Sequence, residues 1–304
     1  MYDVVIVGGG PGGLQAALTL GRARRRVLLA DAGPRRNALA VHVHNFVTRD
    51  GTPPDEFRAI ARAQLAEYPS VEVVEARVDA IAGERGAFEI RLGDRTVQAR
   101  RIVLATGVAD ELLPLDGFRE LWGHAIFQCP YCHGWEVRDR RWGFLALPHA
   151  ATHVLPFALM IRTWTDHVTV FTAGAVAIDP DARATLAAAG IRVETAPIAR
   201  LARDGQRLVA VELAGGASVP CDVLFAQPPQ RQLELVTALG LALDNEGYVA
   251  VDPMKRETSV PGIYAAGDLT TRGQAAVLAA AAGMQAAAAL NVDLALVPTE
   301  SARG

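Results

Sequence analysis

Residues 2–31 read YDVVIVGGGPGGLQAALTLGRARRRVLLAD, and this stretch decides the fold. Tyr2–Val7 is a short run of β-branched and apolar residues, which predicts a strand. A glycine-rich loop follows it and leads into a helix-like stretch that runs to about Arg24. Arg26–Ala30 predicts a second strand, and Asp31 comes directly after it. A strand, a glycine loop, a helix, a strand and an acid in this order are what a dinucleotide-binding fold requires.

The glycines of the loop, Gly8-Gly9-Gly10-Pro11-Gly12-Gly13, have separate roles in such a fold. Gly8 permits the tight turn, Gly10 lets a pyrophosphate approach the backbone, and Gly13 lets the helix pack close to the strand. The helix N-terminus then faces the phosphates with its partial positive charge. Asp31 is placed to accept hydrogen bonds from an adenosine ribose. We therefore predict that Gly8, Gly10, Pro11, Gly13 and Asp31 bind an adenine dinucleotide.

The composition describes a globular protein of ordinary charge. Its 304 residues are enough for two domains, and 51% of them are apolar against 21% charged. The net charge of -3 gives no electrostatic reason to expect nucleic acid or an anionic membrane as a partner. The apolar run Ala275–Leu290 contains Gln285 and is weakly hydrophobic for a bilayer span, and the first strand begins at residue 2. We therefore expect a cytoplasmic protein with no membrane partner.

The order of predicted elements repeats along the chain. Strands are predicted at Val71–Glu75, Ala87–Leu92, Thr96–Ala99 and Arg101–Ala105, and a strand, a helix and a strand follow at Trp142–Leu147, Ala150–Thr163 and His167–Phe171. Two copies of one βαβ-plus-meander unit predict an α/β fold with two dinucleotide-binding, Rossmann-like domains of three ββα layers. A long alanine-rich helix closes the chain and belongs with the first domain. Residues 1–112 and 243–304 are therefore expected to form the first domain, and residues 113–242 a second domain inserted into it.

A Cys-x-x-Cys pair lies in the expected insertion, within Cys129-Pro130-Tyr131-Cys132-His133. In a compartment that keeps thiols reduced, such a pair is catalytic or binds a metal. Zinc needs about four ligands, whereas the only other cysteine is Cys221 and the histidines are scattered, so we expect no metal site. Histidine titrates near neutral pH and can take and return a thiol proton. We predict Cys129 and Cys132 as a redox pair and His133 as its acid and base; buried thiols and a structural histidine are the alternatives.

With these residues in hand, the chain resembles the low-molecular-weight thioredoxin reductase family over nearly its whole length. The motifs that carry the resemblance stand in the family's order: the glycine loop, Asp31, Asn45-Phe46, Ala105-Thr106-Gly107, the Cys-x-x-Cys pair and Gly267-Asp268. The resemblance implies that the first and last segments bind FAD, that the middle domain carries the dithiol and binds NADPH, and that the protein is a homodimer. By the same resemblance, the further FAD contacts are Asn45, Thr106, Gly107, Gly267 and Asp268 at the ribityl-phosphate portion, and Gln274 and Ala275 near the ring.

The sequence departs from the family's pattern in three places. Where family members have Arg-Gln-Ala, this chain has Arg272-Gly273-Gln274-Ala275. Thioredoxin reductases usually carry an aspartate after the second cysteine, and here that residue is His133; the motif Cys-x-x-Cys-His-Gly-aromatic-Glu resembles the flavin-dependent dithiol oxidases for gliotoxin and holomycin. The second nucleotide loop reads Ala146-Leu147-Pro148, and the basic cluster after the next strand is replaced by Phe171-Thr172-Ala173-Gly174-Ala175. Because Pro148 lacks a backbone donor and no cation meets the 2′-phosphate, ordinary NADPH binding is not expected.

These features predict an FAD-dependent dithiol oxidase. The resemblance implies that Cys132 faces the flavin and that Cys129 exchanges with substrate, which is a small-molecule dithiol or a thioredoxin-like protein. Dioxygen would then reoxidise the flavin. A disulfide reductase that receives electrons from ferredoxin or another donor is the first alternative, and a flavin redox sensor without turnover is the second.

Several other polar and aromatic residues keep two interpretations each. His42 and His44 line the flavin edge or are polar loop residues. Tyr131 and Trp135 shape a substrate pocket or simply pack as an aromatic turn. His149 and His153, where a cofactor loop would stand, are expected to be ordinary satisfied or exposed histidines, and Cys221 to be inert core.

Overall fold

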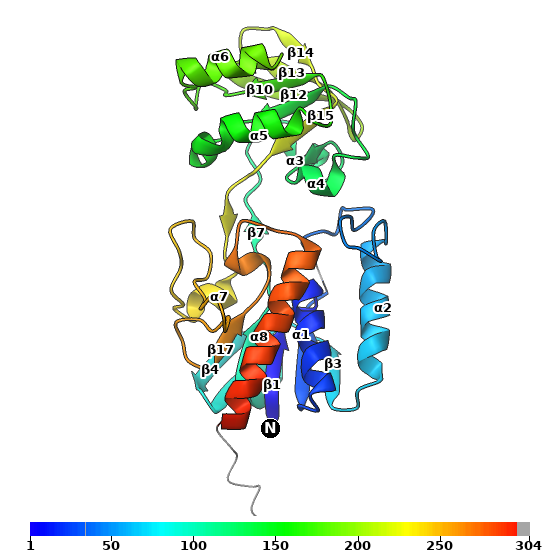
Figure 1. The fold of residues 1–304 in the computed structure, drawn as a ribbon, viewed down its shortest axis with the longest axis vertical. Helices are drawn as coiled ribbons and strands as arrows, with labels where there is room; N and C mark the ends of the chain where they lie inside the picture. The colour runs from blue at the N-terminus through cyan, green and yellow to red at the C-terminus, as the bar shows by residue number, and fades with distance from the viewer. Residues whose placement is uncertain (34, 297–304) are drawn as a thin grey trace, which may run out of the picture. The chain divides into compact units, whose positions relative to one another are not determined.

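A computed structural model describes residues 1–33 and 35–296, and within it the chain forms two compact units (Figure 1). Unit 1 comprises Met1–Ala109 and Gln230–Gly304, and unit 2 comprises Asp110–Pro229. The chain crosses between the units at strands β7 (Ala109–Asp110) and β16 (Gln230–Arg231), which form a two-stranded sheet of their own. Residues 297–304 of the expected first domain lie outside the described residues.

The second boundary of the insertion differs from the predicted one. The sequence placed residues 230–242 in the inserted domain, whereas the structure places them in unit 1. Val236 is buried in the same apolar cluster as Val249, and the Gln232 side-chain amide donates to the carbonyls of Gly247 and Leu269, both at 3.0 Å. These contacts form with residues later in the chain, so the local sequence alone does not assign residues 230–242 to unit 1.

Unit 1 is built on a seven-stranded sheet in the order β3-β2-β1-β6-β5-β4, with β17 paired to β6. Its elements are β1 (Tyr2–Val7), α1 (Pro11–Arg22), β2 (Val27–Asp31), α2 (Pro54–Ala66), β3 (Val71–Glu75), β4 (Ala80–Glu84), β5 (Ala87–Leu92), β6 (Arg95–Leu104), α7 (Glu234–Ala238), β17 (Ile263–Ala265), the 3-10 helix η2 (Asp268–Thr270) and α8 (Ala276–Leu296). Strands β3, β2, β1, β6 and β17 are parallel to their neighbours, and β4, β5 and the first half of β6 form an antiparallel meander.

Strand β6 unites two strands that the sequence predicted separately. Thr96–Ala99 pairs antiparallel with β5, whereas Arg101–Leu104 pairs parallel with β1 and β17. Arg100, between them, is only 8% exposed, and its guanidinium donates to Asp3 at 3.2 Å. A paired arginine can remain inside a buried strand, which is why this polar residue does not break it.

The long helix α8 lies along α1, as Figure 1 shows. A methyl group at Gly283 would overlap the carbonyl of Gly12, so the two helices approach at their glycines. By length and composition alone α8 could cross a membrane, contrary to the expectation from the shorter run Ala275–Leu290, because the helix continues to Leu296. One face of α8 is packed in unit 1, since Leu290 lies with residues of α1 and β1 in one buried cluster, whereas Leu278, Met284 and Val292 are exposed.

Unit 2 repeats the plan of unit 1 with a parallel sheet in the order β11-β10-β9-β15-β8 and an antiparallel sheet in the order β12-β13-β14. Its elements are α3 (Phe118–Leu121), β8 (Ile126–Phe127), α4 (Pro130–His133), β9 (Trp142–Leu145), the 3-10 helix η1 (Pro148–His153), α5 (Val154–Ile161), β10 (Val168–Phe171), α6 (Pro180–Ala188), β11 (Arg192–Glu194), β12 (Ile198–Asp204), β13 (Arg207–Leu213), β14 (Ser218–Pro220) and β15 (Val223–Ala226). The parallel sheet has one buried cluster against the helices and another against the antiparallel strands. The predicted α/β fold of two related Rossmann-like units is therefore confirmed.

Candidate functional site

The glycine loop of unit 1 is tight on its protein side and open on the other. Gly8 has a φ of +110°, and a methyl group there would overlap the carbonyl of Ala105. A methyl group at Gly13 would overlap the carbonyl of Gly8, which is the close helix–strand packing expected at this position. At Gly10, by contrast, an added Cβ meets nothing within 4 Å. Because Pro11 begins α1 directly after this open position, the loop can receive a diphosphate against its backbone and the helix N-terminus.

Asp31, at the end of β2, is fixed by two arginines of α2. Asp31 is 6% exposed; Arg58 forms a short ion pair with its carboxylate, and Arg62 donates to it at 3.1 Å. The Gly33 backbone also donates to Asp31, at 3.3 Å. Burial acts to raise the pKa of Asp31, but the Arg58 charge and the hydrogen bonds together hold that pKa below its usual value. The predicted ribose acceptor is therefore a carboxylate, oriented by partners that the sequence analysis missed.

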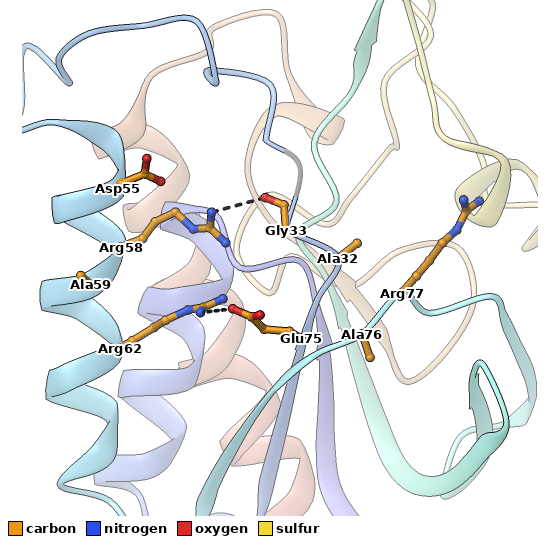
Figure 2. Close-up of a pocket in the computed structure, with 9 residues that line it drawn as sticks. All are labelled: Ala32, Gly33, Asp55, Arg58, Ala59, Arg62, Glu75, Ala76 and Arg77. Carbon is orange, nitrogen blue, oxygen red and sulfur yellow. Dashed lines mark hydrogen bonds and ion pairs between the residues drawn. The ribbon is translucent and has the colours of Figure 1, made fainter.

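A pocket of about 400 Å³ opens beside this carboxylate (Figure 2). It is lined by Ala32, Gly33, Asp55, Arg58, Ala59, Arg62, Glu75, Ala76 and Arg77. Arg58 also donates to the Gly33 carbonyl at 3.4 Å, and Arg62 pairs with Glu75 at 2.7 Å, as the dashed lines in Figure 2 mark. The i, i+4 spacing of Arg58 and Arg62 puts both on one face of α2, a signal that was available in the sequence. The position of this pocket, directly after β2, suits the adenosine end of a dinucleotide.

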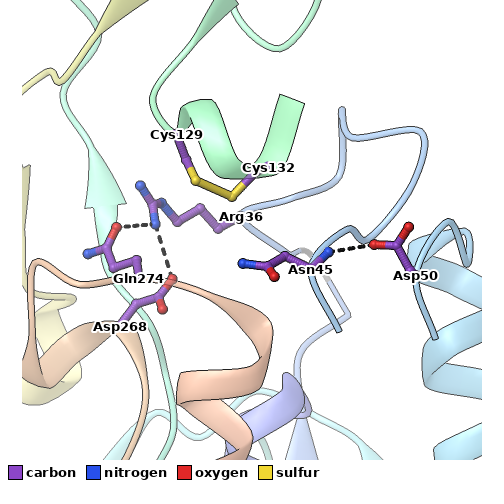
Figure 3. The surroundings of a disulfide bond; sticks show 7 residues. All are labelled: Arg36, Asn45, Asp50, Cys129, Cys132, Asp268 and Gln274. Carbon is purple, nitrogen blue, oxygen red and sulfur yellow. Dashed lines mark hydrogen bonds and ion pairs between the residues drawn. A yellow bond between two sulfur atoms is a disulfide. The ribbon is translucent and has the colours of Figure 1, made fainter. Parts of the chain in front are cut away.

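The other predicted end of the FAD site is a hydrogen-bonded cluster of Asp268, Gln274 and Arg36 (Figure 3). Arg36 Nη1 lies 3.1 Å from Asp268 Oδ2 and 2.5 Å from Gln274 Oε1. The side-chain amides of Gln274 and Gln230 donate to each other at 2.8 and 3.2 Å. Tyr248 donates its hydroxyl to Gln230 at 2.8 Å. The structure thus brings Asp268 and Gln274 together, and it adds Arg36 and Gln230, which the sequence analysis did not identify.

The remaining predicted FAD contacts lie at turns around these two ends. Gly267 has a φ of +92°, a conformation that glycine adopts without strain, and Ala275 directly precedes α8. Thr106 and Gly107 follow β6, and the Thr106 Cα would lie 3.3 Å from a Cβ at Gly8, so this segment borders the glycine loop.

Asn45 lies in a turn of its own in the segment between β2 and α2. It has a φ of +59°, and its backbone donates to Asp50 Oδ1 at 2.7 Å. In the described part of the chain, no hydrogen bond or ion pair joins the Asn45 side chain to the other predicted contacts. His44 approaches Asp50 at 3.5 Å, and its ring meets that of His42 edge-on at 5.8 Å.

Unit 2 holds the predicted redox pair as a disulfide between Cys129 and Cys132 (Figure 3). Cys129 is the N-cap of the short helix α4, and Gly134 closes it with a 2.7 Å hydrogen bond to the Pro130 carbonyl. A methyl group at Gly134 would overlap that carbonyl and lie 3.1 Å from the rings of Trp142 and Trp164. The turn therefore sits directly on a tryptophan pair, which requires glycine at this position.

His133 is stacked face to face on Phe127, the last residue of β8. The ring centroids are 4.4 Å apart and the planes differ by 13°. Phe127 is itself 7% exposed and packed in the core of unit 2, so the stack orients the imidazole. This partner could not be predicted from the sequence, because the two rings meet only once strand β8 and helix α4 are placed in space.

Two large aromatic side chains near the redox pair are exposed. Tyr131 is 59% and Trp135 is 67% exposed. The Tyr131 ring meets Trp164 edge-on at 5.4 Å, and the Arg138 guanidinium lies 4.1 Å from the Trp135 ring centroid. Both rings are thus held in place on one side while they face solvent on the other, which suits contact with a substrate.

The second nucleotide loop differs from the first in its backbone. After β9 the chain enters the 3-10 helix η1, which begins at Pro148 and contains the non-helical residue Ala150 (φ -114°, ψ 15°). The regular helix α5 begins only at Val154. The His149 ring lies 3.0 Å from the Gln227 carbonyl, across the mouth between β9 and β15 where a Rossmann domain places its ligand. This loop has neither the glycines nor the helix N-terminus of the first one.

The third cysteine lies in the core of unit 2. Cys221 is 2% exposed, and burial raises the pKa of its thiol to about 12. Such a thiol is protonated and inert at neutral pH. Among residues 1–33 and 35–296, no group of three or more His, Cys, Asp or Glu side chains could hold a metal ion.

Comparison with known proteins extends the sequence resemblance. A model of the family described as pyridine nucleotide-disulphide oxidoreductase matches residues 2–286. The thioredoxin reductase tcpT of Claviceps purpurea is 33% identical, over 88% of this chain and 86% of that protein. The crystal structure of the oxidoreductase from Agrobacterium tumefaciens is 42% identical with a TM-score of 0.90, over 98% of this chain and 99% of that one. The crystal structure of HlmI is 38% identical with a TM-score of 0.86, over 97% of this chain and 92% of that one.

Proposed function

The chain belongs to the pyridine nucleotide-disulphide oxidoreductase family, and from that premise we propose that it is a dithiol oxidase that uses dioxygen and not NADPH. Membership makes it an FAD-dependent thiol–disulfide oxidoreductase. The residues of unit 1 fit the cofactor, because the glycine loop is open at Gly10 and acids stand at both predicted ends, Asp31 and Asp268. When bound, FAD supplies the two-electron chemistry that links a dithiol to dioxygen.

The redox pair of unit 2 performs the exchange with substrate. A substrate thiolate attacks Cys129 Sγ and breaks the Cys129–Cys132 bond, which gives a mixed disulfide at Cys129 and a thiolate at Cys132. The second substrate thiol then attacks the mixed disulfide, so that the substrate leaves as a disulfide and the enzyme holds two thiols. His133 takes the substrate thiol proton, with its ring held by Phe127. Over one cycle a dithiol and dioxygen become a disulfide and hydrogen peroxide.

One observation carries the choice of dioxygen over a nicotinamide donor: the two nucleotide loops of this chain are unlike each other. The first has the open glycine and a helix that starts beside it, whereas the second passes from β9 into η1 at Pro148, with His149 across its mouth. Residues 172–182, directly after β10, contain no basic side chain to pair with a 2′-phosphate. A phosphate group that meets neither a cation nor a helix N-terminus loses roughly several kcal/mol of binding free energy.

We expect NADPH and NADH to show no micromolar binding to the purified protein. The altered second loop offers neither backbone donors nor a cation for their phosphates. Isothermal titration calorimetry measures this directly, with FAD titrated into apoprotein as the positive control. Micromolar binding of either nucleotide would restore a nicotinamide-fed reductase.

We expect a small dithiol to drive oxygen uptake by the FAD-loaded protein, with one hydrogen peroxide formed for each dioxygen consumed. An oxygen electrode and a peroxide assay measure the two quantities in one reaction. A monothiol is the control, because it lacks the second thiol that resolves the mixed disulfide at Cys129.

A second candidate is a disulfide reductase that takes electrons from ferredoxin or another protein. The relative tcpT, which is 33% identical, is named a thioredoxin reductase and favours this candidate. Its substrate would be a thioredoxin-like protein. If no dithiol supports oxygen uptake and reduced ferredoxin drives disulfide reduction, electrons flow from flavin to disulfide and the oxidase proposal is wrong.

A further inference from the structure

We propose that Arg36 is a cofactor-binding residue of unit 1: its guanidinium is the counter-charge that lets the FAD diphosphate and the Asp268 carboxylate share one site. The proposal rests on FAD as the cofactor and is independent of the direction of electron flow. Neither the glycine loop nor the Gly267-Asp268 motif supplies a positively charged side chain. In this proposal the charge comes from the segment between β2 and α2.

The geometry places this arginine among residues already implicated in flavin binding. Arg36 Nη1 lies between Asp268 Oδ2, at 3.1 Å, and Gln274 Oε1, at 2.5 Å, and Figure 3 shows both contacts as dashed lines. The side chains of Arg36 and Asp268 are 25% and 26% exposed, so the ion pair is shielded from most of the solvent. Gln230 fixes the Gln274 amide from the other side through two hydrogen bonds. The guanidinium is thus held in one place by a carboxylate and an oriented amide.

The family resemblance puts the ribityl-phosphate portion of FAD beside Asp268, and this favours a cation at this place. A diphosphate carries negative charge, and a carboxylate beside it repels that charge most strongly where water is partly excluded. The glycine loop, residues 8–13, contributes backbone donors and a helix N-terminus but no basic side chain. The Asp31 end of the site shows the same arrangement, since that carboxylate also carries arginine partners, Arg58 and Arg62. At each end of the site the carboxylate is therefore paired with arginine, so the two acids do not prevent an anionic cofactor from binding.

The nearby arginines have other partners. Arg272, from the motif that departs from the family's Arg-Gln-Ala, approaches Glu246 at 3.4 Å. Arg256 donates to the Thr270 hydroxyl at 2.6 Å, and its burial lowers the pKa of its guanidinium. Arg36, by contrast, contacts Asp268 and Gln274 themselves.

The test is FAD binding to apoprotein of Arg36→Gln, Arg36→Lys and Arg49→Gln, measured by titration at low and high salt. Arg36→Gln should raise the FAD dissociation constant about 10- to 100-fold, the range for one charge-assisted contact. Arg36→Lys should recover part of this loss because it restores the charge without the planar fork. Arg49→Gln is the matched control, because it removes from the same segment a positive charge whose guanidinium donates to the Thr48 carbonyl at 3.3 Å and not to Asp268 or Gln274. The wild-type affinity should fall with salt more steeply than that of Arg36→Gln.

The thermal unfolding midpoint of the Arg36→Gln apoprotein shows whether Arg36 balances the cofactor charge or only holds its segment against Asp268. If Arg36 is a counter-charge, the apoprotein of Arg36→Gln melts as the wild type does, and only the upward shift on adding FAD becomes smaller. A lower apoprotein midpoint with an unchanged FAD dissociation constant would show that Arg36 merely ties the segment to Asp268, and would overturn the proposal. An equal loss in Arg49→Gln would do the same. Failure of the wild type to bind FAD would instead remove the cofactor assignment itself.

Discussion

Replacing Cys132 by serine should slow reduction of the bound flavin by any dithiol by about 10⁴-fold or more. Cys132 is one half of the only disulfide among the described residues, and the family resemblance makes it the thiol that passes electrons to the ring. A serine hydroxyl can neither form the disulfide nor carry two electrons. Anaerobic stopped-flow absorbance of the flavin band measures the rate.

Two further cysteine variants make this result specific. Cys129→Ser should block exchange with substrate but leave Cys132 as a free thiolate, visible as a long-wavelength charge-transfer band with the flavin. Cys221→Ser should reduce at the wild-type rate, because Cys221 is buried and protonated in the core of unit 2. Rapid flavin reduction in Cys132→Ser would mean that the dithiol reduces the ring directly and that the disulfide has another use.

Replacing His133 by alanine should lower turnover by roughly 10²–10⁴-fold, the usual contribution of a positioned acid–base group. The effect should fall on kcat without loss of FAD, because His133 belongs to unit 2 and the cofactor residues to unit 1. Oxygen uptake at saturating dithiol, together with the flavin absorbance of the purified variant, measures both quantities.

The control for this prediction is another histidine of unit 2. His149→Ala should turn over as the wild type does, because that ring contacts the Gln227 carbonyl at 3.0 Å, in the second nucleotide loop. His133→Asn should behave like His133→Ala, since an amide keeps polarity but moves no proton at neutral pH. Near-normal turnover of His133→Ala would assign the imidazole to packing on Phe127 and leave the proton transfer to another group.

The fold and the first nucleotide loop could be predicted because their requirements are local. A glycine at residue 8 is needed for a positive φ and a close approach, and the alternation of strands and helices shows directly in the sequence. Arg36 could not be found in this way, because its partner Asp268 is 232 positions away along the chain. Phe127 was missed for a similar reason: only the three-dimensional turn lays the His133 ring on it.

The second boundary of the insertion shows the same limit. Pro228 and Pro229 stand directly before residue 230, but residues 230–242 join unit 1 through contacts to Gly247, Val249 and Leu269, which lie later in the chain. A homodimer, which the family resemblance implies, stays a prediction.

Because unit 2 divides the sequence of unit 1, the ribosome synthesises the two parts of unit 1 at different times. Strands β1 to β6 are made first, yet the parallel half of β6 has an open edge until β17 emerges, and α1 lacks its cover until α8 is complete. Unit 2 is continuous and can reach its native structure while the N-terminal sheet is still unfinished. Asp268 and Gln274 belong to the last segment, so the predicted FAD site is complete only after this segment has been synthesised. A polypeptide truncated after unit 2 would be colourless and would expose a strand edge to aggregation.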